Sequence, residues 1–553
     1  MRKKINDNTG ASQMKQTYDF DFIVIGSGFG GSVSAHRLTE KGYKVGVIEK
    51  GKRYRPKDFP KTNWHLKKFL WFPQLSLHGF FQMTLFSHVW ILTGVGVGGG
   101  SLVYACTSLQ PPDTIWHDHR WAKLNDWVNV MPTFFDESRR MLGVKTNTYF
   151  GRADKILQKA AENIGRGDTY YPTEVAVYFG ENGKVVPDPY FDGEGPARTG
   201  CKLCGGCMIG CRNGAKNTLD RNYLYLAEKH GTKIIPETRV VSIKPLNGST
   251  DGSDGYEIHT VSSTRLFGKE RKVYRSRGVV FSGGVLGTVK LMLDMKENGS
   301  MPYLSDQVGE YVRTNSESII GIQMDDEGID VTDGIAIGSG FYLDDHTHIE
   351  AVRYPKGSDS ISLVTTLLTG GKLGSSRILS WLKVIALNPI KFLRTLIPFD
   401  FAKTNVMLLV MQTIDNHIRM RLKKSWYSPF TKTLETVGAN IPTYIPQANQ
   451  FAEKMGHDLN GTPKTSLAEI FMNVPTTAHI LGGAIMGANP NEGVTDNKSR
   501  IFNYKNMYVC DGSMIGANLG VNPSLTITAL SEYVMDNVQS ADETDWNEIG
   551  QTL

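Results

Sequence analysis

The feature that most constrains the fold is a glycine motif near the N-terminus, G-x-G-x-x-G, formed by Gly26, Gly28 and Gly31. It follows an apolar run at residues 20–25 (FDFIVI) that predicts a buried strand, and it precedes a pattern that predicts a helix. The first glycine permits a tight turn, the second lets a pyrophosphate approach the main chain, and the third lets helix and strand pack closely. The next predicted strand ends on Glu49, whose carboxylate can accept both hydroxyls of an adenosine ribose. Together these features predict a Rossmann-like dinucleotide-binding domain.

The motif alone does not distinguish NAD from FAD, and further glycine-rich segments bear on the choice. They are residues 93–101 (TGVGVGGGS), residues 478–483 (AHILGG), and the pair 509–513 (VCDGS) and 520–524 (GVNPS). A flat ring bound against main chain requires residues without side chains, and glycine runs provide them. The segments therefore favour FAD over NAD.

In this order the segments resemble the glucose–methanol–choline (GMC) oxidoreductase family, and within it the cholesterol-oxidase-like branch. The matching letters are GVGGGSLV, H-x-L-GG and YVxDGS…GVNPSLTITAL, and the resemblance runs from residue 18 to about 538. It implies an FAD-dependent enzyme that oxidises the CH–OH group of an alcohol by hydride transfer to flavin N5. It puts residues 96–101 along the isoalloxazine ring, Val240 near the adenine, and Asp511 and Gly512 near the ribityl chain and pyrophosphate. The FAD contacts that it implies are Gly26, Gly28, Gly31, Glu49, Gly96, Gly98, Gly99, Gly100, Ser101, Val240, Asp511 and Gly512.

The resemblance also assigns a catalytic pair, His479 and Asn522. Hydride removal from an alcohol needs a group that accepts the hydroxyl proton, and a neutral imidazole with an amide can orient one oxygen for it. His479 is expected to accept or share that proton, and Asn522 to hold the oxygen and contact the reduced flavin. The plainer alternatives are a structural histidine beside a glycine turn and an asparagine that caps the last helix.

Glu350 is the third catalytic candidate. It lies in HIEAVRYPKG, which matches the segment of the cholesterol oxidases that carries a glutamate serving as base in isomerising the steroid double bond. A carboxylate in an apolar pocket has a raised pKa, as such a base requires. The alternative is a surface glutamate on a strand. Tyr104 and Ala105 replace the asparagine and glycine of the sterol oxidases, and Ala484 stands where a cysteine is common, so sterol specificity is in doubt.

Four of the six cysteines, Cys201, Cys204, Cys207 and Cys211, have the C-x2-C-x2-C-x3-C spacing of bacterial ferredoxins. Arg212 follows the fourth cysteine where ferredoxins have proline, and the chain has no second such motif. The spacing leaves three alternatives: an iron–sulfur cluster, a structural zinc, or disulfides and free thiols. With a cluster the enzyme would pass electrons to a quinone or redox protein; without one, O2 is the simpler acceptor and peroxide the product.

The glycine-rich segments lie at both ends of the chain, so the nucleotide domain is expected to be discontinuous. The predicted class is α/β: a Rossmann-like FAD-binding domain with an inserted α+β substrate-binding domain on a mostly antiparallel sheet. The predicted parts are a flexible tail at 1–17, the FAD-binding domain at 18–110, 200–319 and 475–553, a connecting region with mixed contacts at 111–199, and the substrate-binding domain at 320–474.

Local patterns predict the remaining elements. A helix is expected over residues 218–229 and a last helix over 523–538. Strands are expected over 233–282 and over most of 318–370. A basic, apolar stretch over 376–424 is expected to be helical.

Two apolar segments suggest where the substrate enters. Residues 64–90 are rich in tryptophan and phenylalanine, and residues 377–397 mix apolar side chains with lysine and arginine and contain no acidic residue. A basic amphipathic stretch can lie on a membrane surface; the alternative is that both segments line the core or a pocket. We therefore expect a hydrophobic alcohol (sterol, terpenoid or long-chain) and a contact with the membrane surface.

Bulk properties limit the other partners. A formal net charge of +6 over 553 residues is weak support for nucleic-acid binding, and none is expected. The N-terminus has no apolar segment typical of a secretory signal, which favours the cytoplasm, with peripheral contact to the inner face of the membrane. Two rival functions remain: an NAD-dependent dehydrogenase, and a lipid-binding or electron-carrier flavoprotein without alcohol chemistry.

Overall fold

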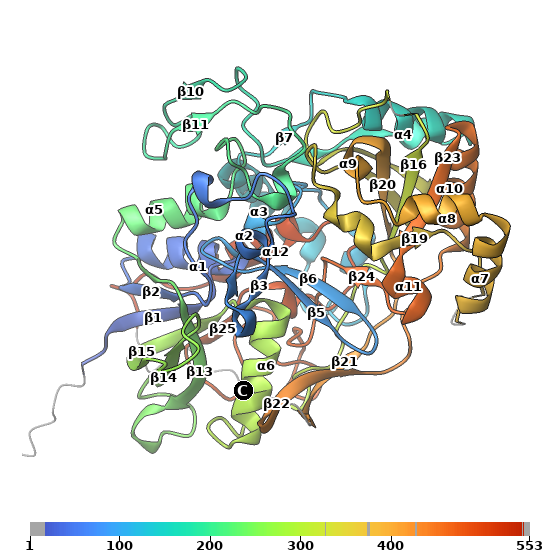
Figure 1. The fold of residues 1–553 in the computed structure, drawn as a ribbon. Coiled ribbons are helices and arrows are strands. Elements are labelled where there is room, and N and C mark those ends of the chain that lie inside the picture. Colours follow the sequence, from blue (N-terminus) through green and yellow to red (C-terminus); the bar gives the residue numbers. More distant parts are fainter. Residues whose placement is uncertain (1–16, 327, 373–375, 426–427, 545, 547–553) are drawn as a thin grey trace, which may run out of the picture.

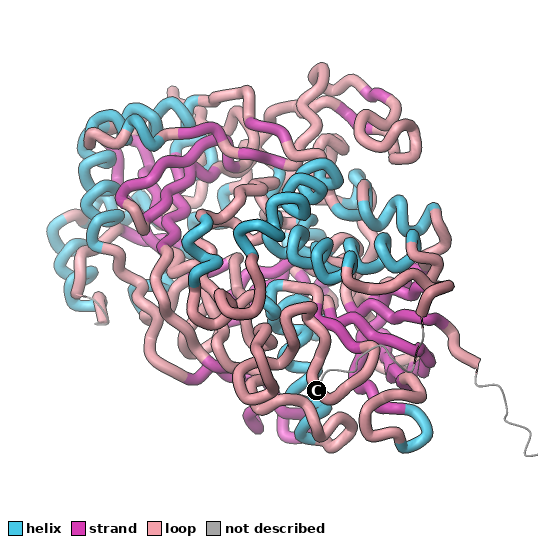
Figure 2. The backbone as a smooth tube through the Cα atoms, turned by 180° about the vertical axis from the view of Figure 1, so that it is seen from behind, coloured by secondary structure: helices cyan, strands magenta, loops and turns pink. Residues whose placement is uncertain are grey.

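The computed structural model describes residues 17–326, 328–372, 376–425, 428–544 and 546, with side chains in these ranges except at 425–431. Two seven-stranded sheets form the framework (Figure 1). Seen from behind, their two groups of strands stand apart, one on each side of the molecule (Figure 2). The predicted N-terminal tail at residues 1–17 lies almost wholly outside the described residues.

The first sheet is built around parallel strands. Its members are β1 (Phe20–Ile25), β2 (Val45–Ile48), β12 (Lys233–Ile235), β13 (Thr238–Pro245), β14 (Tyr256–Ser262), β15 (Arg271–Phe281) and β25 (Met507–Val509). β1 pairs in parallel with β2 and β15, β12 pairs with β2, and β25 pairs with the end of β15. β14 and β13 extend the sheet in antiparallel sense. A parallel centre whose strands are buried on both faces is the Rossmann-like arrangement that the glycine motif predicts.

Helices enclose this sheet. They are α1 (Phe29–Glu40), α3 (Trp127–Leu142), α5 (Tyr223–Lys229), α6 (Gly284–Glu297) and α12 (Ser524–Asp536). α1 packs against α12 and α5, and α12 packs against α3, while α6 packs against β13 and the hairpin of β21 (Arg419–Ser425) and β22 (Ser428–Val437). α1 starts directly after the glycine turn, so its N-terminus lies at the carboxyl end of β1.

The second sheet is antiparallel in every pairing. Its order is β19-β23-β16-β20-β18-β17-β8. The bounds are β8 (Tyr171–Pro172), β16 (Ser318–Met324), β17 (Ile337–Asp344), β18 (Thr347–Val352), β19 (Thr365–Leu367), β20 (Asn405–Gln412) and β23 (Gly461–Ser466). α4 (Arg152–Asn163) and α10 (Pro446–Asp458) pack on one face, against side chains such as Ile320 and Leu408 that are fully buried. The other face is the one that carries Glu350.

Shorter elements connect the two halves. β24 (Thr476–Thr477) pairs in parallel with β6 (Trp90–Gly94), which pairs with β5 (Phe81–Leu85). The remaining short strands and helices are β3 (Trp71–Phe72), β4 (Leu77–His78), β7 (Lys145–Thr146), β9 (Glu174–Val175), β10 (Val185–Val186), β11 (Arg198–Thr199), α2 (Leu66–Phe69), α7 (Ile378–Leu387), α8 (Pro389–Thr395), α9 (Phe401–Thr404) and α11 (Leu467–Phe471). No described helix has both the length and the apolar character needed to cross a bilayer.

Some predicted elements were wrong. The helix expected over 376–424 ends at α9, and the rest of that stretch contains β20 and β21. β20 was missed because its sequence, NVMLLVMQ, is apolar on both faces, and such a run has no strand periodicity. The helix expected from 218 starts only at Tyr223, after a short turn.

The strands of the second sheet all lie between residues 318 and 466, apart from β8. On this basis we propose the predicted division, with the substrate-binding domain at 320–474 and the FAD-binding domain in three segments. The β21–β22 hairpin is an exception, because it belongs to the inserted range yet packs on α6.

Candidate active site

Ser27, in the turn after β1, joins three parts of the predicted cofactor region. Its Oγ lies 2.8 Å from Glu49 Oε2 and 3.2 Å from the Gly96 carbonyl oxygen, and it accepts a hydrogen bond from the Gly98 N–H at 3.2 Å. One buried hydroxyl therefore connects the first glycine motif, the acidic residue and the second glycine loop. Sequence reasoning missed Ser27, because it occupies an unspecified position of the G-x-G-x-x-G motif.

Glu49 lies at the end of β2 and is buried. Its carboxylate accepts from the Gly51 N–H at 2.7 Å and from the N–H and Oγ of Ser27. A carboxylate has about four lone-pair sites, so one remains for a ribose hydroxyl and its predicted role stays a prediction. The Thr238 N–H donates to the Glu49 carbonyl at 2.9 Å. This bond brings the start of β13, and with it Val240, beside the end of β2, where an adenine is expected.

The two glycine segments touch each other. A Cβ added to Gly99, whose φ is +51°, would lie 2.6 Å from the Cα of Gly28. Ser101 closes the second segment, because its Oγ donates to the Gly98 carbonyl at 2.7 Å and accepts from the Leu219 N–H at 3.0 Å. The loop at 96–101 is therefore held against the turn that begins α1.

The C-terminal cofactor segment is equally fixed. Asp511 Oδ2 accepts from Thr288 Oγ1 at 2.6 Å, and Oδ1 accepts from the Ser513 N–H at 2.8 Å. Burial raises the pKa of Asp511. The Gly482 N–H donates to the Gly512 carbonyl at 2.9 Å, which ties this segment to the turn three residues after His479.

The residues at the start of α1 fit a dinucleotide phosphate. A Cβ added to Gly31 would lie 2.2 Å from the Gly26 carbonyl oxygen. The lack of a side chain at Gly31 therefore lets α1 pack closely against the turn after β1. A Cβ added to Gly28 would meet nothing within 4 Å. Gly28 is also the N-cap of α1, where no side chain caps the helix and the first turn has no acidic residue. Free N–H groups and a positive dipole end facing open space are what a pyrophosphate requires.

His479 is paired with a glutamate that the sequence did not indicate. Its Nδ1 lies 2.6 Å from Oε1 of Glu317, which is 1% exposed. At this distance the Glu317 carboxylate interacts directly with the imidazole nitrogen. Glu317 is held by Thr477 Oγ1, which donates at 2.8 Å, and by the Ala478 N–H at 3.1 Å. A contact at Nδ1 leaves Nε2 as the nitrogen that can face a ligand.

The charges around His479 set its basicity. Burial alone would lower the pKa of His479, but Glu317, with a smaller contribution from Glu350, raises it above its usual value. The imidazole is therefore a stronger base than a free histidine. It can accept a proton only while neutral, which favours its function at higher pH.

Asn522 and Glu350 form the second polar pair. Asn522 Nδ2 donates to Glu350 Oε2 at 3.3 Å, and both side chains are buried. Within the described residues, Asn522 Oδ1 and Glu350 Oε1 have no hydrogen-bond partner. Two buried acceptors without a donor are costly unless a ligand supplies one. The hydroxyl of an alcohol is such a donor.

Burial raises the pKa of Glu350 to about 7, although Asn522 and His479 counteract part of the effect. Because the folded protein binds this proton more tightly than the unfolded chain, its stabilising contribution is full below about pH 4.5 and is lost as the pH rises through about 7. A pKa shift of this size corresponds to about 3 kcal/mol in the free energy of unfolding.

Glu350→Gln should remove this pH dependence. As the pH rises from 5 to 8, the melting temperature of the variant should fall less than that of the wild type. Intrinsic fluorescence measures both melting temperatures. Glu270→Gln is the matched control, because the Glu270 side chain lies at the surface and is 50% exposed. Parallel melting curves for wild type and Glu350→Gln across that range would contradict the raised pKa.

The loops that carry these groups are tied to the cofactor segments. Ser524 Oγ donates to the Thr107 carbonyl at 2.8 Å, and Asn315 Nδ2 donates to the Val521 carbonyl at 2.8 Å. Asn522 is thereby fixed between the segment after the second glycine loop and the start of β16. The structure thus gathers His479, Asn522 and Glu350 in one buried region beside the glycine loops.

Among the described residues, the cysteines of the C-x2-C-x2-C-x3-C motif are not arranged as a metal site. Cys201, Cys207 and Cys211 share a hydrophobic cluster with Cys106, while Cys204 is exposed. Across the part of the chain that the structure describes, no three Cys, His, Asp or Glu side chains are arranged to hold a metal ion. As placed, these thiols do not fit the predicted iron–sulfur or zinc site. Cys106, far away in sequence, was not predicted to join them.

Lys216 gives the cysteine loop a structural connection. Its buried ammonium donates to the carbonyl oxygens of Leu102, Tyr104 and Cys207 at 3.1, 2.8 and 2.9 Å. It therefore holds the loop at 201–211 against the chain that follows the second glycine loop.

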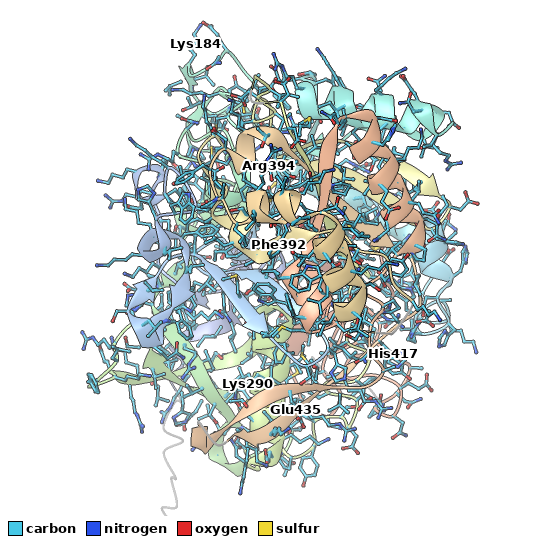
Figure 3. The ribbon with its side chains drawn as sticks, turned by 45° about the vertical axis from the view of Figure 1, so that its right-hand side comes forward. Lys184, Lys290, Phe392, Arg394, His417 and Glu435 are labelled. Atoms are coloured by element: carbon cyan, nitrogen blue, oxygen red, sulfur yellow. The ribbon has the colours of Figure 1, made fainter. Side chains whose placement is uncertain are left out.

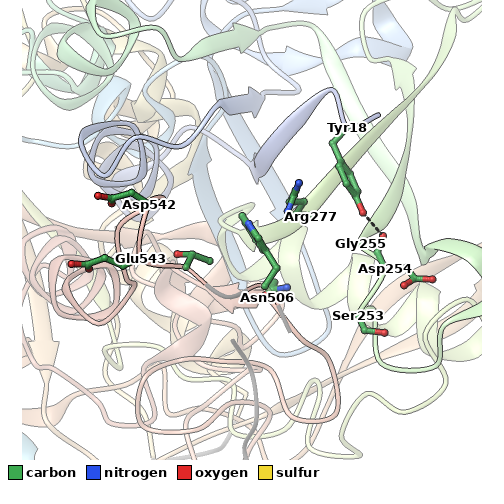
Figure 4. Close-up of a pocket in the computed structure, with 10 residues that line it drawn as sticks. Tyr18, Ser253, Asp254, Gly255, Arg277, Asn506, Asp542 and Glu543 are labelled. Carbon is green, nitrogen blue, oxygen red and sulfur yellow. Dashed lines mark hydrogen bonds between the residues drawn. The ribbon is translucent and has the colours of Figure 1, made fainter. Parts of the chain in front are cut away.

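A pocket of about 580 Å³ lies elsewhere, at the edge of the first sheet (Figure 4). Arg277 lies between the rings of Tyr18 and Trp546, at 5.0 and 5.1 Å, and the Tyr18 hydroxyl donates to the Asp254 carbonyl. None of the predicted site residues lines it. It is a surface hollow between the sheet and the C-terminal segment, not the active site.

Comparison with known proteins identifies the family of this chain. Family models described as GMC oxidoreductase match residues 197–295 and 419–531, and one described as an NAD(P)-binding Rossmann-like domain matches residues 24–55. A cholesterol oxidase of Acinetobacter baumannii is 52% identical over 525 residues, covering 94% of each chain. A cholesterol oxidase of Mycobacterium tuberculosis is 42% identical, covering 95% of this chain and 92% of its own.

More distant relatives share the fold. A long-chain-alcohol oxidase of Arabidopsis thaliana is 23% identical, covering 94% of this chain and 67% of its own. The crystal structure of pyridoxine 4-oxidase from Mesorbium loti superposes with a TM-score of 0.60 at 14% identity, covering 93% of this chain and 98% of its own.

The chain belongs to the GMC oxidoreductase family. It is a cholesterol-oxidase-like member: an FAD-dependent enzyme that oxidises the CH–OH group of alcohols. This confirms the predicted family, fold class and FAD cofactor, and it excludes the NAD-dependent dehydrogenase.

Proposed function

We propose that this enzyme oxidises a hydrophobic alcohol, a sterol or a long-chain alcohol, to the carbonyl compound with O2 as the electron acceptor. One observation carries the proposal: the pairs His479–Glu317 and Asn522–Glu350 lie close together, and the segments of His479 and Asn522 are hydrogen-bonded to the predicted cofactor segments. Asn522 Oδ1 and Glu350 Oε1 have no hydrogen-bond partner among the described residues, so the region leaves polar atoms available to a ligand. The floor next to Glu350 is apolar.

Each side chain has a role in this proposal. The bound FAD supplies the hydride acceptor. His479 accepts the hydroxyl proton through Nε2 as the carbon–hydrogen bond breaks, and Glu317 positions the ring and stabilises the imidazolium that forms. Asn522 holds the alcohol oxygen through its amide. Glu350, ionised above about pH 7, is the base that would shift a neighbouring double bond in a steroid ketone.

The names of the relatives support the substrate class. Two are cholesterol oxidases and another is a long-chain-alcohol oxidase, so each acts on an alcohol with a large apolar body. The same names favour O2 over a quinone or redox protein.

The acceptor can be tested directly. With cholesterol or a long-chain primary alcohol in air, we expect one peroxide for each alcohol oxidised, since two electrons leave the alcohol and reduce one O2. Iron and sulfide analysis of anaerobically purified protein should give far less than one equivalent per chain. Stoichiometric iron and sulfide, with turnover only on an added quinone or dye, would instead establish an iron–sulfur dehydrogenase.

A lipid surface is the proposed source of the substrate. Leu379, Leu387, Ile390, Leu393 and Phe399 on and after helices α7 and α8 are between 61 and 83% exposed. Lys383, Lys391 and Arg394 lie among them, with no acidic residue between 377 and 397. Figure 3 shows Phe392 and Arg394 on α8, on the face turned toward the viewer. Exposed apolar side chains flanked by cations suit an anionic bilayer.

By contrast, the aromatic segment at 64–90 is partly core. Phe69, Trp71 and Phe80 are buried, and the rings of Phe69 and Phe81 stack at 4.7 Å. Trp64 and Phe72 stay exposed. The α7–α8 region is therefore the better candidate for membrane contact.

The pair Leu387→Glu and Ile390→Glu tests this contact. Burying each side chain in lipid is worth about 1.5–3 kcal/mol, so the double variant should bind anionic vesicles at least tenfold more weakly. Cosedimentation with phosphatidylserine-containing vesicles measures this. Val185→Glu, at an exposed position on β10, is the control. Equal sedimentation of all three proteins would contradict the proposed surface.

A further inference from the structure

The floor of the active site is the face of the second sheet that carries Glu350. Register across the strands pairs Glu350 with Leu409 and Leu409 with Ile319. Two residues along each strand, the next row on the same face pairs Val352 with Met407, Met407 with Gly321, and Gly321 with Lys464. Because side chains alternate between faces, Glu350 and Lys464 lie on one face at diagonally opposite corners.

This face is not filled like its opposite. Ile319 and Leu409 lie on central strands, yet their side chains are only half-buried. On the opposite face, under α4 and α10, their sequence neighbours Ile320 and Leu408 are fully buried. Gly321 contributes no side chain beside Lys464, although the Asn405 side chain leans over it. The partial exposure of Ile319 and Leu409 shows that space remains above these two residues of the floor.

Lys464 is a buried cation without a counter-ion. Its side chain is 1% exposed, and its ammonium lies 5.0 Å from the centre of the Phe401 ring. Among the described residues its ammonium has no hydrogen-bond partner and no acidic partner, whereas the ammonium of Lys216 donates to backbone carbonyl oxygens. Burial lowers its pKa to about 8. An unpaired buried charge is costly, so this position makes physical sense if a ligand supplies an anion.

We propose that Lys464 is the second polar anchor of the substrate site and binds a carboxylate at the end of the alcohol opposite the reacting hydroxyl. The inference rests on the proposed function and narrows its substrate class to amphipathic hydroxy acids, such as a steroid with an acidic side chain or an ω-hydroxy fatty acid. Three strand spacings and two residues separate the corners, about 16 Å. The apolar body of such a substrate would lie on Leu409 and Ile319.

The test compares substrate pairs that differ only in the far end. One pair is a 3-hydroxysteroid with a side-chain carboxylate and its methyl ester; the other is an ω-hydroxy fatty acid and its methyl ester. We expect wild type to prefer the acid at least tenfold in kcat/KM for flavin reduction. In Lys464→Met the acid-to-ester ratio should fall by tenfold to a hundredfold, roughly the worth of a hydrogen bond to a charged group. Lys356→Met, an exposed lysine, should keep the wild-type ratio.

Each other outcome also decides the question. No preference for the acid in wild type, or equal changes for acid and ester in Lys464→Met, would overturn the inference while leaving the proposed function intact. If no alcohol of either pair reduces the flavin, the proposed function fails. Lys464 is then judged by binding of a steroid carboxylate without the hydroxyl: tenfold weaker binding in Lys464→Met supports the anchor, and equal binding overturns it. If Lys464→Met loses its flavin, Lys464→Gln is measured in its place. If both variants lose their flavin, the preference of the wild type for the acid over the ester decides the question.

Discussion

His479→Ala should keep its flavin and lose most of its alcohol-dependent flavin reduction, by about 10²–10⁴-fold, the usual worth of a general base. The flavin should stay because His479 contacts Glu317 and not the glycine segments at 26–31 and 96–101. The rate should fall because the variant lacks the imidazole nitrogen that accepts the hydroxyl proton, and Asn522, a neutral amide, cannot take the proton in its place. Stopped-flow reduction under anaerobic conditions gives the rate, and the visible spectrum gives the flavin content.

The controls for His479 separate chemistry from folding. His457→Ala removes a histidine whose side chain is 92% exposed and should reduce flavin at the wild-type rate. If His479→Ala retained both its flavin and its rate, His479 would be a structural residue beside a glycine turn. The enzyme would then need another base, and a flavoprotein without alcohol chemistry of its own would regain support.

Gly28→Ala should fold and fail to retain FAD. An added methyl group meets no protein atom within 4 Å, and a φ of −72° is allowed for alanine. The methyl group would occupy the space where main-chain N–H groups must approach the pyrophosphate. Losing one or two charge-assisted hydrogen bonds weakens binding by roughly tenfold to a hundredfold or more. Flavin per chain after gel filtration, with circular dichroism for folding, measures this.

Gly268→Ala is the matched control for a lost glycine. Gly268 lies in an exposed hairpin loop with nothing within 4 Å, although its φ of +56° makes alanine strained there. It should keep a full complement of flavin at a small cost in stability. Full flavin in Gly28→Ala would mean that the pyrophosphate does not lie at the start of α1.

The parts of the fold that the sequence predicted are those set by local chemistry. The strand at 20–25, the glycine turn and the helix after it follow from residues adjacent in the chain. Short motifs in the sequence predicted three site residues: Asn522, His479 and Glu350. The structure brings these residues together, while their catalytic roles stay predictions.

What the sequence did not reveal depends on tertiary contacts. Glu317 precedes β16 in an unremarkable segment, and only the pairing of β24 with β6 and the turn after it bring His479 to it. Likewise, only the strand register shows that Lys464 lies on the face of the sheet that carries Glu350. Strand β20 was hidden because a run buried on both faces shows no alternation. The cysteine spacing left iron–sulfur, zinc and free or disulfide-bonded thiols open, and the described thiols are not arranged to hold a metal, because spacing in sequence does not fix where four sulfur atoms point.

The most direct test of the central claim is an absorption spectrum of anaerobically purified protein before and after a hydrophobic alcohol is added. We predict oxidised-flavin bands that bleach with cholesterol or a long-chain alcohol and return when air is admitted. Flavin bands that none of a panel of sterols, terpenoid alcohols and long-chain alcohols bleaches would contradict the claim.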